Sequence, residues 1–261
     1  MLNLDNLFKY HLIKISMNQK NEGYPKTLLI IFLILFAISS IGVQFQFDFF
    51  LEHILTVLVL ALLIFTYKNF RLSNISYTLI FAFMLLHILG AHYTYSLVPY
   101  NAWSKSLFGF SIDAYFGFTR NMYDRLVHFS FGLFFVYPVR EFFMRVVTTR
   151  GIWGYYLPLD VMASFSVIYE LMEFGVAVMF SGDVAANYNG EQGDKWDAHK
   201  DMFLAILGGI VTMFVTFCIN WKYKKNFEKD LESSFSVKNK TPLGEVELRK
   251  IMNKKPLGRK V

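Results

Sequence analysis

Ionisable side chains stand at helical spacing inside several apolar stretches of this chain. Asp124 and His128 are four residues apart, and Glu170 and Glu173 are three apart. Residues at these spacings lie on one face of a helix. An isolated charge in hydrocarbon is costly, so such groups must be protonated, paired or bound to a metal. The pattern indicates a buried polar site in a membrane protein.

A third group of acids stands where a polar loop runs into an apolar stretch, in GDKWDAHKDMFLAILGG at residues 193–209. Asp194, Asp197 and Asp201 are separated by three and four residues. They predict either carboxylate ligands of a divalent cation or, for Asp194 and Asp197, acids that cap the helix and favour its positive N-terminus. Asp201 lies further into the apolar stretch, which favours a functional role.

We expect these groups to meet in one metal site, with Glu170 as a general base. Carboxylates combined with imidazole favour Zn, Mn or Fe over Ca. The predicted metal ligands are Asp124, His128, Glu173, Asp197 and Asp201. The predicted accessory residues are His92, Asp194 and His199.

Each group also has a structural interpretation that needs no ligand. Asp124 would cap its helix beside a histidine that bonds a neighbouring helix. The two glutamates would form a buried salt bridge with Arg125 or Arg140. His92, at the end of an apolar stretch, would be an ordinary interfacial histidine.

Composition places these groups in a bilayer. The chain has 261 residues, of which 54% are hydrophobic and 18% aromatic, and its mean hydropathy is +0.36. Apolar stretches of about the length of a membrane span recur along it. We therefore predict an all-α polytopic bundle of about six spans. The expected spans are about 27–45, one ending near 67, 77–93, 123–147, 156–180 and 201–221.

Charge divides the chain into three predicted parts, which are a basic N-terminal segment (1–26), a membrane domain (27–221) and a basic tail (222–261). The tail contains 12 Lys/Arg and 5 Asp/Glu, whereas the rest is nearly neutral. The high pI therefore reflects the tail and not a nucleic-acid surface. Met17 is an alternative start to Met1, and a single cysteine excludes an internal disulfide.

Loop charge also predicts the topology. The N-terminal segment, the tail and the loops after the second and fourth spans are rich in Lys and Arg, so both termini are expected in the cytoplasm. The acids and histidines then converge near the outer face. The aromatic loop at 93–121 is predicted to form an interfacial belt or to cover the site. We expect a loosely ordered tail.

Four segments resemble the YjdF-type inner-membrane proteins of bacteria, over about residues 30–221: HYTYSLVPYNAW, YDRLVHFSFGLFFVYPVREFF, YELMEF and NGEQGDKWDAHKDMFLAILGG. The resemblance implies a multi-pass protein of the bacterial inner membrane. A more distant resemblance is to the VanZ-like membrane proteins, of which one member is linked to glycopeptide-antibiotic tolerance, and it implies a cell-envelope role. Its motifs fall on Asp124, His128 and Phe129, on Glu170 or Glu173, and on Asp197, Asp201 and Gly208. Ala205 departs from that pattern, which usually has Asn there.

Three classes of function fit these observations. The first is a metal-dependent enzyme that hydrolyses a lipid or cell-envelope headgroup. The second is a transporter or a ligand-binding membrane protein. The third is a structural membrane protein with an interhelical polar network. The expected partners are the lipid bilayer and a lipid or cell-envelope substrate, with no nucleic acid, and the sequence does not define the oligomeric state.

Overall fold

Five helices of the described part of the chain are long and apolar enough to cross a bilayer. At 19 to 27 residues they are roughly 28 to 40 Å long, which matches a hydrocarbon core of about 30 Å. The computed structural model describes residues 23–180, 192–237 and 243–253. The five helices are α2 (Gln46–Thr66), α3 (Asn74–His92), α6 (Tyr123–Phe142, continued by a π-helical turn, Phe143–Val147), α7 (Trp153–Met179) and α9 (Asp197–Tyr223).

Large apolar side chains cover the outside of these helices. Phe65 on α2, Phe174 on α7 and Phe214 on α9 are among many that are more than half exposed. Lipid tails solvate such surfaces, whereas water does not. The prediction of an all-α, multi-pass membrane protein is confirmed.

The stretch predicted as the first span forms a shorter apolar helix, Gly23–Ser39. Its Phe32 is buried against Ile80, Met84 and Ile88 of α3. Its Tyr24 hydroxyl lies 2.7 Å from the Thr78 hydroxyl at the start of that helix. This helix is therefore part of the bundle, at the lower limit of the length that spans a bilayer.

Helices α6 and α9 form the most extensive packed pair among the described elements. Glycines let their backbones touch. A Cβ atom on Gly132 would overlap the Ala205 carbonyl oxygen, and one on Gly208 would overlap that of Phe129. This crossing lies next to the predicted site, so it holds α6 and α9 at the short separation that the site needs.

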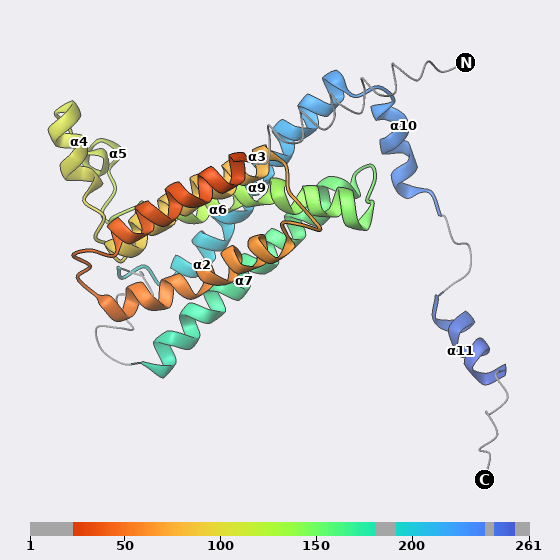
Figure 1. The fold of residues 1–261 in the computed structure, drawn as a ribbon, viewed down its shortest axis with the longest axis horizontal. Coiled ribbons are helices and arrows are strands. Elements are labelled where there is room, and N and C mark those ends of the chain that lie inside the picture. Colours follow the sequence, from red (N-terminus) through yellow and green to blue (C-terminus); the bar gives the residue numbers. More distant parts are fainter. Residues whose placement is uncertain (1–22, 181–191, 238–242, 254–261) are drawn as a thin grey trace, which may run out of the picture.

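The aromatic loop contains two short helices, α4 (Tyr100–Phe108) and α5 (Ile112–Phe116), which lie at one end of the bundle (Figure 1). Tyr100 fixes them to α6. Its hydroxyl donates to Asp113 at 2.5 Å and accepts from the Met122 amide at 2.7 Å. Burial, together with the bond to Asp113, raises the pKa of Tyr100 to about 12.

The basic tail contains α10 (Phe227–Glu232), a 3-10 turn (Ser233–Phe235) and α11 (Leu243–Asn253), at the opposite end from α4 and α5 (Figure 1). The Ser234 hydroxyl accepts a hydrogen bond from the Ile152 amide, and its carbonyl accepts one from the Trp153 indole. The expectation of a loosely ordered tail was therefore wrong for this part, because Ser234 fixes it to the α6–α7 loop. The N-terminal residues 1–22, with the alternative start at Met17, lie outside the described residues.

Candidate metal centre in the helix bundle

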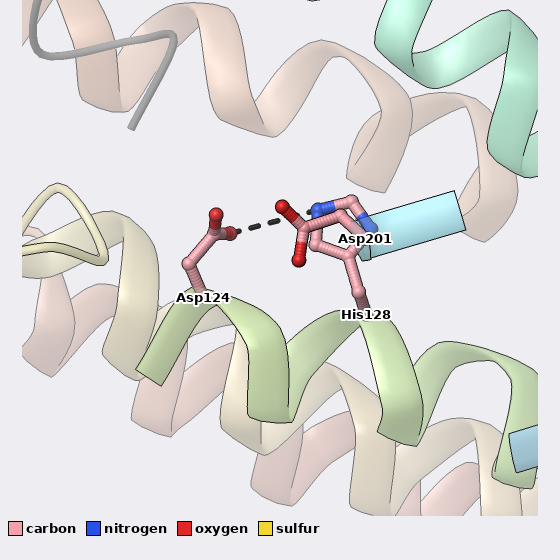
Figure 2. Close-up of side chains that lie close together, drawn as sticks. All are labelled: Asp124, His128 and Asp201. Atoms are coloured by element: carbon pink, nitrogen blue, oxygen red, sulfur yellow. Dashed lines mark ion pairs between the residues drawn. The ribbon is translucent and has the colours of Figure 1, made fainter. Parts of the chain in front are cut away.

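Three predicted ligands meet between α6 and α9. Asp124, His128 and Asp201 each offer one ligand atom, and these atoms lie within 4.8 Å of one another. Figure 2 shows Asp124 and His128 rising from one face of α6 beside the Asp201 carboxylate from α9. All three side chains are largely buried. The helical spacing brings the α6 pair together, and the glycine crossing brings α9 to it.

The imidazole of His128 lies between two carboxylates. Its Nε2 atom is 3.6 Å from Asp124 Oδ1, and its Nδ1 atom is 3.6 Å from Glu170 Oε1 on α7. Within the described part of the chain, Glu170 Oε1 and Asp201 Oδ1 have no hydrogen-bond partner. Buried polar atoms of this kind require an explanation, and a bound cation is one. Asp124 does not cap its helix, which begins after Met122 without a side-chain cap.

Glu173, a predicted ligand, is buried one helical turn from Glu170 on α7, outside the group of Asp124, His128 and Asp201. Neither glutamate has Arg125 or Arg140 as its partner. Arg140 instead stacks over the Tyr155 ring at 4.8 Å.

Asp197, another predicted ligand, is held by two arginines. Arg120 forms a bidentate pair with it, and Arg125 Nη2 lies 3.1 Å from its Oδ1 atom. Arg125 also reaches Asp194, at 2.5 Å. The salt bridge expected between Arg125 and the glutamates is therefore made with these aspartates. It ties the start of α6 to the start of α9.

Asp194 is a loop residue that supports the start of α9. Its Oδ2 atom is 2.5 Å from the Lys200 ammonium, and its Oδ1 atom accepts the Trp196 amide. The Lys200 hydrogen bond, with help from the other donors, lowers the pKa of Asp194. Asp194 therefore stays ionised at physiological pH.

The two accessory histidines lie apart from the group of three. His92 Nδ1 is 2.7 Å from the Ser39 carbonyl oxygen, so it joins α3 to the Gly23–Ser39 helix. His199 is exposed and packs against the Trp196 ring. In the structure both have local structural contacts.

A second polar cluster, which was not predicted from the sequence, adjoins His128. The Tyr95 hydroxyl lies 2.5 Å from His87 Nδ1 and 3.4 Å from Glu52 Oε2. The Tyr169 hydroxyl lies 3.3 Å from the same glutamate oxygen, and its ring packs edge-on against that of His128. The polar region therefore extends from α6 and α9 to α2 and α3.

Part of this cluster had a signal in the sequence. Glu52 is an acid within an apolar stretch of the sequence, and it lies inside α2, which begins at Gln46. The contact of Tyr95 with this cluster could not be predicted from the sequence. The chain reverses after α3 with positive φ angles at Thr94 and Tyr95, which turns that ring back over Gly90.

The polar clusters form one end of a cavity of about 340 Å³ between α2, α3, α6 and α7. His87, Tyr95, Asp124, His128 and Tyr169 line that end. The rest of the wall is largely apolar. This volume and this lining are typical of a small-molecule site, where a few polar groups fix the orientation of a mainly apolar ligand.

The fold and the site define a class: multi-pass, all-α membrane proteins with an intramembrane carboxylate and imidazole cluster. Residues 24–222 match the family model described as "Predicted membrane protein (DUF2238)", so the chain belongs to that family. The inner membrane protein YjdF of Escherichia coli (strain K12) is 35% identical over 158 residues, which cover 60% of this chain and 71% of that protein. No solved structure matches the chain.

These findings confirm the resemblance to YjdF-type proteins and agree with the predicted location in the bacterial inner membrane. The resemblance to VanZ-like proteins stays a prediction.

Proposed function

We propose that this protein is a membrane-embedded, divalent-metal-dependent hydrolase that acts on a lipid or cell-envelope headgroup. One observation carries the proposal: three ligand atoms, from Asp124, His128 and Asp201, lie within 4.8 Å of one another at the polar end of a cavity. Among the described residues, this is the one group of three or more metal-ligating side chains that is so close. Two carboxylates with one imidazole fit Zn, Mn or Fe better than Ca.

The bound metal would activate a water molecule for attack on the headgroup and stabilise the charge that develops there. Glu170 would accept the proton of that water; its Oε1 atom lies 3.6 Å from His128 Nδ1 and has no hydrogen-bond partner in the described chain, which supports this role. Asp197 would act indirectly, by holding α9 in place through the two arginines.

The cavity favours a hydrolase over a cation transporter. A cation path needs polar groups from one side of the bundle to the other. The described wall of the cavity instead becomes apolar away from the cluster, with Phe135, Val139 and Met162 at its far end. Such a wall suits the hydrocarbon part of a substrate whose headgroup reaches the metal.

Metal analysis of the detergent-purified protein tests the proposal. We expect the wild type to contain close to one equivalent of a divalent transition metal. Asp201→Ala and His128→Ala should each lower the metal content at least tenfold, because each removes one of three ligands.

His199→Ala is the matched control, since this histidine is exposed on the same helix as Asp201 and should leave the metal content unchanged. All variants are compared at equal purity and with the same elution profile in size-exclusion chromatography. A folded wild type that contains no metal, even after incubation with Zn²⁺ or Mn²⁺, would refute the proposal.

A further inference from the structure

Two buried hydroxyls line the cavity without a hydrogen-bond partner in the described chain. They belong to Thr56 on α2 and Ser166 on α7, which are 3% and 1% exposed. A helical Ser or Thr usually bonds the carbonyl four residues earlier, as Ser164 does with Asp160 at 2.9 Å. Thr56 and Ser166 make no such bond, so each has a hydroxyl donor beside the cavity that the described chain does not use.

Both hydroxyls lie at the same depth. Thr56 is one turn beyond Glu52 on α2, and Ser166 is one turn before Glu170 on α7. The two helices run in opposite directions, and Tyr169 and Glu52 make a contact between them at the level of the polar cluster. Thr56 and Ser166 are therefore each about 6 Å further into the cavity than the acids.

The wall of the cavity thus changes its chemistry in three steps. Carboxylates and imidazoles come first, at Asp124 and His128. The two hydroxyls come next, and beyond them the wall is apolar, at Val59, Phe135 and Met162. A glycerophospholipid has the same order, because a phosphate is followed by ester carbonyls and then by acyl chains.

The cavity also has a route from the bilayer. Phe165, Ile168 and Met172 of α7 line the cavity and are each more than a third exposed, so α7 does not close the cavity with buried side chains. In the described structure, α2 packs mainly on α3 and has little contact with α7. A lipid chain could therefore enter between α2 and α7 without crossing a polar surface.

We propose that the cavity binds a glycerophospholipid, with its phosphate at the Asp124, His128 and Asp201 group, its ester carbonyl at Thr56 and Ser166, and its acyl chain along the apolar wall. The position of the phosphate rests on the function proposed above. The ester contact rests on the two hydroxyls alone. An isoprenoid phosphate has no ester carbonyl, so it would leave both hydroxyls without an acceptor.

Two lipids that differ in one carbonyl test this proposal: 1-lauroyl lysophosphatidic acid, an ester, and its 1-O-dodecyl ether counterpart. Binding of each to the purified protein is measured by native mass spectrometry. We expect the wild type to bind the ester about fivefold more tightly, which is the effect of one net hydrogen bond. In the Thr56→Val/Ser166→Ala double variant, the ratio of the two affinities should fall to about one.

Ser164→Ala is the matched control, since it removes an exposed hydroxyl two residues away that already bonds its own helix. It should keep the wild-type ratio. Because the measured quantity is a ratio within one preparation, a partly unfolded variant does not distort it. Equal binding of ester and ether by the wild type, or an ester preference that survives in the double variant, would overturn the proposal.

Metal content is determined on the same preparations. The metal-dependent hydrolase and the glycerophospholipid site can therefore be refuted independently of each other. An ester preference in a metal-free wild type would support the lipid site and overturn the metal-dependent hydrolase. A metal-loaded wild type that binds ester and ether equally would overturn the lipid site alone.

Discussion

At the scale of single residues, the acids near the site divide into two kinds. Asp197 has its carboxylate satisfied by Arg120 and Arg125. Asp201, four residues later on the same helix, is 2% exposed and has an oxygen without a hydrogen-bond partner in the described chain. A paired buried charge contributes to stability through its partners, whereas an unpartnered one is kept at a cost and so indicates function.

This difference predicts that two similar substitutions change the stability of the protein by different amounts. Asp197→Asn should destabilise the protein by on the order of 3 kcal/mol, since it removes the buried charge that Arg120 and Arg125 share. Asp201→Asn should change stability by less than about 1 kcal/mol, because Asp201 forms no ion pair within the described part of the chain. Thermal unfolding of both variants in the same detergent, with metal removed by a chelator, measures the difference. Equal losses of stability would contradict the division of the acids.

The residues that could be predicted from the sequence are those whose partners lie within one helix. Asp124 and His128 could be paired from their spacing alone, and they do lie together. The partners of Asp197 could not be predicted in this way. Arg120 lies in the loop before α6, 77 positions away in sequence, and only the docking of that loop on α9 brings it to the aspartate.

At the scale of the elements, the site depends on how closely α6 approaches α9. Gly132 on α6 and Gly208 on α9 have the facing backbone in the space that a Cβ atom would occupy. The sequence contains both glycines, but it does not say which helix each one meets. That contact is long-range, so helical periodicity could predict the face of α9 that bears Asp201 but not its distance from His128.

We expect Gly132→Ala to push the two helices apart and to destabilise the protein by about 1 to 3 kcal/mol, the usual effect of overpacking. The metal content should fall as well, because Asp201 moves away from the α6 ligands. Thermal unfolding and metal analysis of one preparation report both effects.

Gly175→Ala, on α7, is the control for that substitution. A Cβ atom there would meet nothing within 4 Å, and alanine is the better helix former by about 1 kcal/mol. This variant should be at least as stable as the wild type and should keep its metal. A Gly132→Ala variant that behaves in the same way would show that the close crossing does not set the geometry of the site.

At the scale of the whole molecule, the number of membrane crossings determines on which side of the membrane each terminus lies. Composition predicted six, and the structure has five long helices together with the shorter Gly23–Ser39 helix. Six crossings place both termini on one side of the membrane, and five place them on opposite sides. The basic residues favour the first arrangement, because the N-terminal segment and the tail are both rich in lysine.

Single cysteines at exposed lysines determine this count, in a Cys218→Ser background that removes the one native thiol. Lys26→Cys marks the start of the Gly23–Ser39 helix, Lys225→Cys the end of α9, and Lys105→Cys the α4 helix at the other end of the bundle (Figure 1). With six crossings, a membrane-impermeant maleimide should label Lys105→Cys in intact bacterial cells but reach the other two only after permeabilisation.

Labelling of Lys26→Cys in intact cells, with Lys225→Cys protected, would mean that the 17 residues of the first helix do not cross the bilayer. Protection of Lys105→Cys with labelling of both others would invert the bundle and place the proposed metal site near the cytoplasmic face, since Asp124 and Asp201 lie at the α4 end of their helices.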